Sequence, residues 1–204
     1  MTGLNDRQRL IAALVQSALS KRGATGYSVY CMEQVTPFFS WLTKKYAQLD
    51  IVGSEFLGDY LNPGQIVDGI RHENLQDLSF KDASLDLVIS NDVMEHVPSP
   101  LMAFRELARV MREGSQALMT FPFSLDLDHS ITRAEIINGE LKHLSEPVYH
   151  GNPVSPDGSL VFTDFGWDIF DLVKQSGFKD VSLEIYHSIL FGHLGFGLVF
   201  RLVR

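Results

Sequence analysis

A short stretch, Ser84–Pro100, constrains the fold of this chain more than any other. Its first part, Leu85 to Ile89, is an apolar run with one acid, which is typical of a strand buried on both faces of a parallel sheet. Ser99 followed by Pro100 then predicts the first turn of a helix. Four polar residues lie between strand and helix: Asn91, Asp92, Glu95 and His96. Because ligands of open α/β sheets bind beyond the carboxyl ends of the strands, we expect the function to centre here.

The rest of the chain alternates between helical and strand patterns. Apolar periodicity predicts helices over residues 4–22, 35–48, 100–112 and 165–176, and strands over 27–32, 50–54, 85–89, 116–121, 178–190 and 195–203. A short connection makes the last two strands antiparallel neighbours. The sequence therefore predicts an α/β fold with a mainly parallel sheet.

The composition excludes several classes of protein. A single cysteine, Cys31, rules out an internal disulfide, and together with the missing signal peptide it indicates a reduced, cytoplasmic protein. No apolar run approaches the ~18 residues of a membrane span. The formal net charge of −8 disfavours a nucleic-acid partner, since an acidic surface repels phosphates. We therefore expect no nucleic acid and no membrane among the partners.

The region around the central strand is similar to a known family. The matching text is Leu78–Val88, Glu95–Pro98, Phe104–Val110 and Thr120–Phe123. These segments resemble the central part of class I S-adenosylmethionine (SAM) dependent methyltransferases, of the type 11 kind. The resemblance implies a Rossmann-like, doubly wound, mostly parallel sheet of seven strands with an antiparallel last strand and helices on both faces. It covers residues 27–204, which leaves residues 1–26 as an N-terminal helical extension.

The first strand–helix turn departs from this family. The family places an acid and a Gly-x-Gly-x-Gly pattern there, whereas this chain has Glu33 followed by Gln34-Val35-Thr36-Pro37-Phe38-Phe39. One interpretation is that the cofactor site has decayed and only a binding or scaffold protein remains. The other is that Glu33 and Thr36 hold SAM in a different way. A reductase is a weaker alternative, because no Gly-x-Gly-x-x-Gly occurs at this turn.

Other positions of the chain match cofactor contacts of the family. Glu55 ends the second strand, where an acid can accept both ribose hydroxyls of an adenosine. Asn74 and Leu75 match the acid and small residue that contact adenine, and an amide carbonyl can also accept from an amine. The resemblance thus implies SAM, with S-adenosylhomocysteine as product. The predicted cofactor-binding residues are Glu33, Gln34, Thr36, Glu55, Phe56, Asn74, Leu75 and Asn91.

Catalytic groups are predicted at the mouth of the central strand. Methyl transfer requires a general base only if the acceptor must lose a proton, and His96 or Asp92 could serve. We interpret Glu95 as structural. Asp92-x-x-Glu95-His96 is similar to the Glu-x-x-Glu-His pattern of metal-binding small-RNA and quinone-pathway methyltransferases, so Mg²⁺ remains a minor alternative. Our prediction assigns no metal ligands.

Residues 123–162 break the strand–helix rhythm and form a long insert on the substrate side. Asn138-Gly139 within Thr132–Leu144 predicts a β-hairpin. The candidate substrate contacts of the insert are His129, Arg133, Tyr149, His150 and Asn152. We predict a SAM-dependent methyltransferase that methylates an oxygen or nitrogen of a small-molecule acceptor, as a monomer or homodimer.

Overall fold

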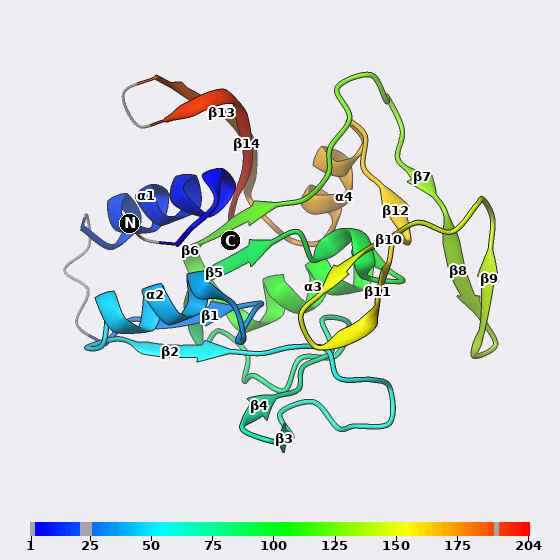
Figure 1. Ribbon diagram of the computed structural model, residues 1–204, viewed down its shortest axis with the longest axis horizontal. Helices are drawn as coiled ribbons and strands as arrows, with labels where there is room; N and C mark the ends of the chain where they lie inside the picture. Colours follow the sequence, from blue (N-terminus) through cyan, green and yellow to red (C-terminus); the bar gives the residue numbers. More distant parts are fainter. Residues whose placement is uncertain (1–2, 21–25, 190–191) are drawn as a thin grey trace.

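The centre of the computed structural model is a six-stranded sheet, and the structure describes residues 3–20, 26–189 and 192–204 (Figure 1). The strand order is β13 (Asp180–Ser188), β14 (His193–Val203), β6 (Met111–Thr120), β5 (Leu85–Asn91), β1 (Ser28–Cys31) and β2 (Asp50–Gly53). Strands β2, β1, β5 and β6 are parallel, and β14 runs antiparallel to both of its neighbours. The predicted mainly parallel sheet with an antiparallel last strand is therefore confirmed.

The main sheet has six strands in the described residues, where seven were expected. Beside β2 the chain forms only one parallel bridge, between Glu55 and His72. The preceding residues fold into a small hairpin of β3 (Ile66–Val67) and β4 (Ile70–Arg71). Its turn has positive φ at Asp68 and Gly69, which supports tight pairing. The turn-rich sequence here thus takes the place of a seventh strand.

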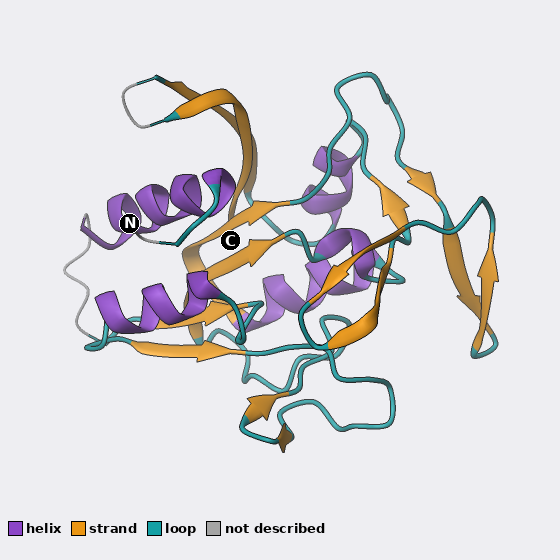
Figure 2. Ribbon diagram, viewed as in Figure 1, coloured by secondary structure: helices purple, strands orange, loops and turns teal. Residues whose placement is uncertain are grey.

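Helices cover both faces of the sheet (Figure 2). The helices α1 (Asp6–Ser20) and α2 (Pro37–Lys45) share one apolar core with Val29 and Cys31 of β1. The helices α3 (Pro100–Val110) and α4 (Ile169–Gln175) share the other core with Tyr30 and Met32. This split follows from strand geometry, because successive side chains point to opposite faces. The end of the first helix expected at Arg22 lies outside the described residues.

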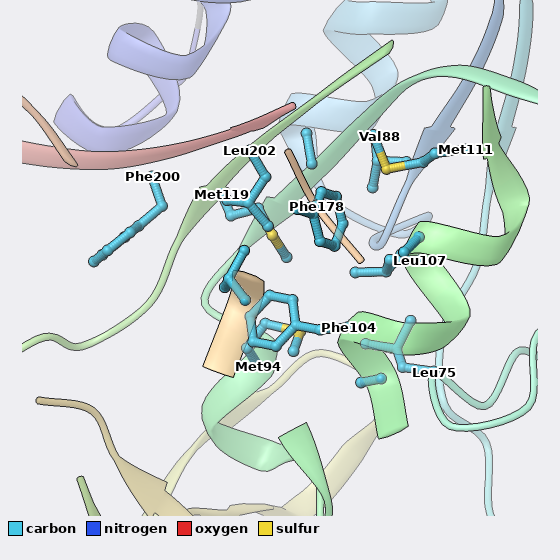
Figure 3. Close-up of a cluster of buried hydrophobic side chains, with 14 of the residues drawn as sticks. Leu75, Val88, Met94, Phe104, Leu107, Met111, Met119, Phe178, Phe200 and Leu202 are labelled. Atoms are coloured by element: carbon cyan, nitrogen blue, oxygen red, sulfur yellow. The ribbon is translucent and has the colours of Figure 1, made fainter. Parts of the chain in front are cut away.

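A buried core lies between α3 and the strands β5 and β6. Phe104 and Leu107 of α3 are fully buried and belong to the same core cluster as Met119, Phe200 and Leu202 of the sheet (Figure 3). Truncation of a buried aromatic such as Phe104 to alanine costs about 3–5 kcal/mol. Polar residues at the end of β5 are therefore carried on a well-packed scaffold.

Helix α3 starts where the sequence predicts but ends two residues earlier. The Ser99 hydroxyl accepts a hydrogen bond from the Met102 amide at 3.4 Å, and Pro100 occupies the first turn. Met111 is already extended and pairs with Leu85, so the helix ends at Val110 rather than Arg112. Gly114, expected as the helix stop, lies within β6 with a φ of 76°.

Helix α4 begins later than predicted. Thr163 and Asp164 were expected to cap it, but they form β12 and pair with β7 (Ile131–Thr132). The helix starts at Ile169. Asp164 is used instead in an ion pair with Arg133 at 2.7 Å, so the competing tertiary contact decides the boundary.

The insert contains two hairpins between β7 and β12. Strands β8 (Ala134–Ile137) and β9 (Glu140–His143) pair across Asn138 and Gly139, both with positive φ. Strands β10 (Tyr149–Asn152) and β11 (Ser155–Leu160) form the second hairpin. In Figure 1, β8 and β9 project outward, whereas β10 and β11 return towards the sheet. Among the described helices, each is too short or too polar to cross a membrane.

Candidate functional site

A cavity of about 670 Å³ lies at the carboxyl ends of β1, β2 and β5. Its floor comes from residues at these strand ends, and the insert covers it with residues 136, 150–154, 158–160 and 162. Arg7 and Gln8 of α1 complete one wall. Its lining includes most of the predicted site residues: Glu33, Thr36, Glu55, Phe56, Asn74, Leu75, Asn91, Asp92, His96, His150 and Asn152.

The glycine-free β1–α2 turn leaves the cavity open. Phe38 is fully buried in the core beneath α2, and Val35 is exposed to solvent. Phe39 packs against the same core, next to Gly53. Thr36 lines the cavity, and its hydroxyl caps α2 by accepting from the Phe39 amide at 3.2 Å. Bulky side chains in this turn therefore do not fill the space in which a cofactor would lie.

The Glu55 side chain fixes the β1–α2 turn, which has none of the glycines that the family usually places there. Its Oε1 accepts hydrogen bonds from the amides of Gln34 at 2.7 Å and Val35 at 3.0 Å. A carboxylate that accepts two backbone amides is a strong local restraint. One oxygen of Glu55 is thus already used, although the residue also lines the cavity.

Gln34 is the predicted cofactor residue that the structure places elsewhere. Its side-chain amide donates to the Gly69 carbonyl at 2.8 Å, and its Oε1 accepts from the Arg71 amide at 2.8 Å. The residue is absent from the cavity lining. Its side chain instead fastens the β3–β4 hairpin to the first turn.

Glu33 and Asn91 join the ends of β1 and β5. The Asn91 side-chain amide donates to Glu33 Oε1, and Glu33 is buried. Burial raises the pKa of the Glu33 carboxyl, while the hydrogen bonds from Thr36 and Asn91 act in the opposite direction. Within the described chain, Asn91 Oδ1 has no hydrogen-bond partner although it is buried. This carbonyl is therefore a candidate acceptor for a bound ligand.

Asp92 is held by two neighbours from other elements. It forms an ion pair with Arg7 of α1, and the Thr120 hydroxyl donates to its Oδ1 at 2.9 Å. Its φ of 53° is unusual for a residue that is not glycine, and short polar residues tolerate it best. Sequence reasoning missed Arg7, because nothing in the pattern of α1 indicates that its first turn meets the end of β5.

Glu95, His96 and His150 form a compact cluster beside the cavity. Glu95 Oε1 lies 3.6 Å from His96 Nε2 and 3.4 Å from His150 Nδ1. Burial raises the pKa of Glu95 to about 7, and the residue's own backbone amide and then Arg7 oppose the rise. Burial also lowers the pKa of His96, and His150 lowers it further. Sequence reasoning does not predict this cluster, because it interprets Glu95 as structural and His150 as a separate substrate contact.

Three predicted substrate contacts lie away from the cavity lining. His129 is largely exposed, 3.9 Å from Asp168. Arg133 binds Asp164 and donates to the Glu146 carbonyl at 2.8 Å, so it anchors the insert. Tyr149 is exposed on β10. Alternation along β10 explains this, because His150 and Asn152 share the face opposite to Tyr149.

The strand order and the cavity at the strand ends define a doubly wound α/β protein with a ligand site at its topological switch. A family model for a methyltransferase domain matches residues 13–119, just over half of the chain. The chain belongs to this methyltransferase family. An uncharacterized methyltransferase of Mycobacterium sp. (strain JLS) is 28% identical over 116 residues. The match covers 54% of this chain and 45% of that relative, so the chain spans less than half of the relative's length.

Solved structures share the fold at low sequence identity. A SAM-dependent methyltransferase from Mesorhizobium loti has a TM-score of 0.53 at 12% identity, over 93% of this chain and 96% of that one. The CurJ carbon methyltransferase has a TM-score of 0.58 at 10% identity, over 96% and 53%. The 1,6-didemethyltoxoflavin-N1-methyltransferase of Burkholderia thailandensis, with 1,6-didemethyltoxoflavin and S-adenosylhomocysteine bound, has a TM-score of 0.50 at 12% identity, over 98% and 78%. These likenesses support the fold.

Proposed function

We propose that this chain binds SAM in the cavity at the strand ends and transfers its methyl group to an oxygen or nitrogen of a small-molecule acceptor. The observation that carries this proposal is the cavity itself, which stays open at about 670 Å³ despite the glycine-free turn. That volume falls within the ~300–1,000 Å³ of small-ligand pockets. Family membership and the bound S-adenosylhomocysteine of the Burkholderia protein are consistent with this cofactor.

The residues that line the cavity fit the chemical groups of SAM. Glu55 would accept from the ribose through the oxygen that the turn amides leave free. Asn74 and Leu75, with Phe56, would bound the adenine. Glu33 would face the ammonium group of the methionine part, with Thr36 and Asn91 beside it. SAM supplies a methyl group on a sulfonium, so the protein has mainly to align the acceptor and exclude water.

The acceptor would enter below the insert, where His96, Asp92 and His150 line the cavity. The Leu160 carbonyl can only accept, so His96 Nδ1 donates to it at 2.8 Å and Nε2 is the nitrogen that can take a proton. His96 and Asp92 are therefore the candidate bases for an acceptor that must lose a proton. The insert hairpin β10–β11 would set acceptor selectivity.

A non-catalytic binding protein is the second candidate. Both amides at the start of the β1–α2 turn are bound by Glu55. Arg7 also reaches across to Asp92 and so links α1 to the acceptor end. A scaffold would keep these internal contacts and bind no cofactor. Cofactor binding therefore discriminates between the two functions.

Calorimetry of the purified chain with SAM and with S-adenosylhomocysteine tests the proposal. We expect both ligands to bind, and Glu55→Gln to weaken binding by about 1–3 kcal/mol. Glutamine keeps an oxygen that can accept from the turn amides, so this variant isolates the ligand contact. Glu113→Gln, at an exposed position on β6, is the matched control and should bind as the wild type does. Absence of binding at millimolar ligand would favour the scaffold.

A further inference from the structure

The Glu95–His96–His150 cluster is assembled by contacts between two distant segments. Glu95 and His96 belong to the short 3₁₀ turn η1 (Met94–His96), and His150 belongs to β10. The Phe162 amide donates to the Glu95 carbonyl at 2.7 Å, and His96 Nδ1 donates to the Leu160 carbonyl at 2.8 Å. These two bonds fix the end of β11 to η1. Because β10 pairs with β11, they also fix the place of His150.

The polar atoms of the cluster lie near one another, but the Glu95 carboxyl forms no hydrogen bond with either histidine. The Glu95 side chain is 0% exposed, and in the described part of the chain neither of its oxygens forms a hydrogen bond with another residue. His96 uses its Nδ1 proton on Leu160, which leaves a lone pair on Nε2 directed at Glu95 Oε1, 3.6 Å away. A buried carboxylate without hydrogen bonds is costly. A cation between the three side chains would give Glu95 Oε1 and the facing nitrogen of each histidine a common partner.

We propose that Glu95, His96 and His150 bind a divalent first-row transition ion, with Zn²⁺ as the best match. Their ligand atoms lie within 4.8 Å of one another, and two of the separations are 3.4 and 3.6 Å. Ligands about 2.0–2.1 Å from a tetrahedral zinc are ~3.3 Å apart, so the two separations that involve Glu95 are close to those of a zinc site. Two imidazoles and one carboxylate suit zinc or iron, whereas Mg²⁺ prefers oxygen ligands.

The surroundings of the cluster fit a metal site. The Leu160 carbonyl accepts from His96 Nδ1 and so orients the ring, which fixes the tautomer that presents Nε2. Asp92, part of the sequence alternative for Mg²⁺, is instead bound by Arg7 and Thr120. The ligand set therefore takes its third member from the insert and not from the Asp-x-x-Glu-His run.

The site would leave coordination positions open towards the cavity. Three protein ligands are the usual complement of a catalytic zinc, and both histidines line the cavity. An ion there would act as a Lewis acid on an acceptor hydroxyl. This role, unlike metal binding itself, rests on the proposed methyl transfer. Asp92 would then be the remaining candidate base, since Nε2 of His96 would be a ligand.

Metal binding is tested on the full chain after treatment with a chelator and dialysis. Zn²⁺ and Mg²⁺ are titrated separately by calorimetry, and bound metal is measured by elemental analysis. We expect one zinc per chain and no binding of Mg²⁺. His150→Ala, on a half-exposed residue, should weaken Zn²⁺ binding ~100-fold or more. His129→Ala in the same insert is the matched control and should bind zinc as the wild type does.

Two further measurements keep the outcome clear. Co²⁺ should give the visible absorption of a tetrahedral site in the wild type and in His129→Ala, but not in His150→Ala. SAM binding is measured on the metal-free protein, so loss of the metal site and failure of the cofactor proposal are separate results. Zinc binding that is equal in wild type and His150→Ala, or no zinc binding at all, would overturn the proposed site.

Discussion

The β1–α2 turn (residues 32–36) and the β5–α3 turn (residues 92–99) reach the same edge of the sheet but differ in how their buried carboxylates, Glu33 and Glu95, are bound. Each ends in a hydroxyl residue that caps its helix, followed by proline: Thr36 and Ser99. In the first turn, Glu55 binds the backbone amides and Asn91 binds Glu33. In the second, the buried carboxylate of Glu95 accepts no hydrogen bond from the described residues.

This difference supports separate roles for the two ends of the cavity. Polar groups that bind one another rigidify a turn and replace the missing glycines with long-range contacts. The desolvation of a buried polar group without a protein partner is uncompensated, and a bound ligand is one way to compensate it. The contrast supports the proposals above, which assign the cofactor to the first turn and the reacting end to the second.

Glu55→Ala should show the largest effect on the first turn. Both turn amides lose a charged acceptor, and each such bond contributes ~1.5–3 kcal/mol. We expect about 3 kcal/mol less free energy of unfolding, measured in urea without ligand. Glu55→Gln keeps an amide acceptor and should lose less than half as much. An equal loss of stability in both variants would mean that the negative charge of Glu55, and not its two hydrogen bonds to the turn amides, stabilises the turn.

Gly53→Ala tests how tightly the same turn is closed. A Cβ at this position would lie 2.5 Å from Phe39 Cε2 and 2.9 Å from the Glu33 carbonyl oxygen. Overpacking of this kind costs about 2 kcal/mol, measurable as a lower urea midpoint. The paired variant on the other side is Ser90→Ala, whose buried hydroxyl has no partner in the described residues. The stability of this variant should be unchanged or slightly higher. A large loss of stability would contradict the prediction that the Ser90 hydroxyl has no stabilising partner.

The sequence predicted the β5–α3 side better than the β1–α2 side. The reason is that the first depends on residues close together in the sequence, whereas the second depends on contacts between residues far apart. The apolar strand, the Ser99 cap and the stripe of α3 are local signals, and the structure has each of them. The hydrogen bonds of Glu55 to the turn amides join residues about twenty positions apart, so no short sequence pattern predicts them. Gln34 shows the same limit, because its motif position suggested a ligand while β3–β4 uses its side chain.

The sequence predicted most residues of the site but not which of them lie in contact. His96 and His150 were both singled out, yet their meeting depends on the β10–β11 pairing and on the Leu160 carbonyl. Arg7 was not singled out, since it belongs to a helix that looked like an extension. Alternation along β10 would have separated His150 from Tyr149 had that strand been recognised. The strand was not predicted because Gly151 and the nearby loop-forming residues are typical of a turn.

Thr36→Ala and Ser99→Ala compare the two helix caps directly. Their hydroxyls accept from Phe39 at 3.2 Å and from Met102 at 3.4 Å. Loss of either cap should lower the free energy of unfolding by about 1 kcal/mol in thermal or urea unfolding. Thr36 also lines the cavity, so only Thr36→Ala should in addition weaken SAM binding. Equal SAM affinity in both variants would remove Thr36 from the proposed cradle.

Glu33→Gln gives the smallest expected change in stability and separates structure from binding. Burial raises the pKa of the Glu33 carboxyl in the folded protein, so the folded state holds this proton more tightly than the unfolded state. The free energy of unfolding should therefore fall as pH rises from the ordinary value of about 4.5 through the raised pKa, by at most ~1.4 kcal/mol for each pH unit between them.

Removal of this carboxylate should flatten that part of the stability curve. Urea unfolding of Glu33→Gln at about pH 5 and about pH 8 measures the slope, and Glu140→Gln on the exposed strand β9 is the matched control. The variant should be as stable as the wild type or more so at the higher pH. If Glu33 faces the ammonium group as proposed, the variant should also bind SAM more weakly, because it lacks that charge. Such a trade of stability for function is expected where a buried charge serves a ligand. An unchanged pH slope would show that Asn91 and Thr36 already compensate the burial of Glu33, and that the first turn is even more self-contained than its hydrogen bonds indicate.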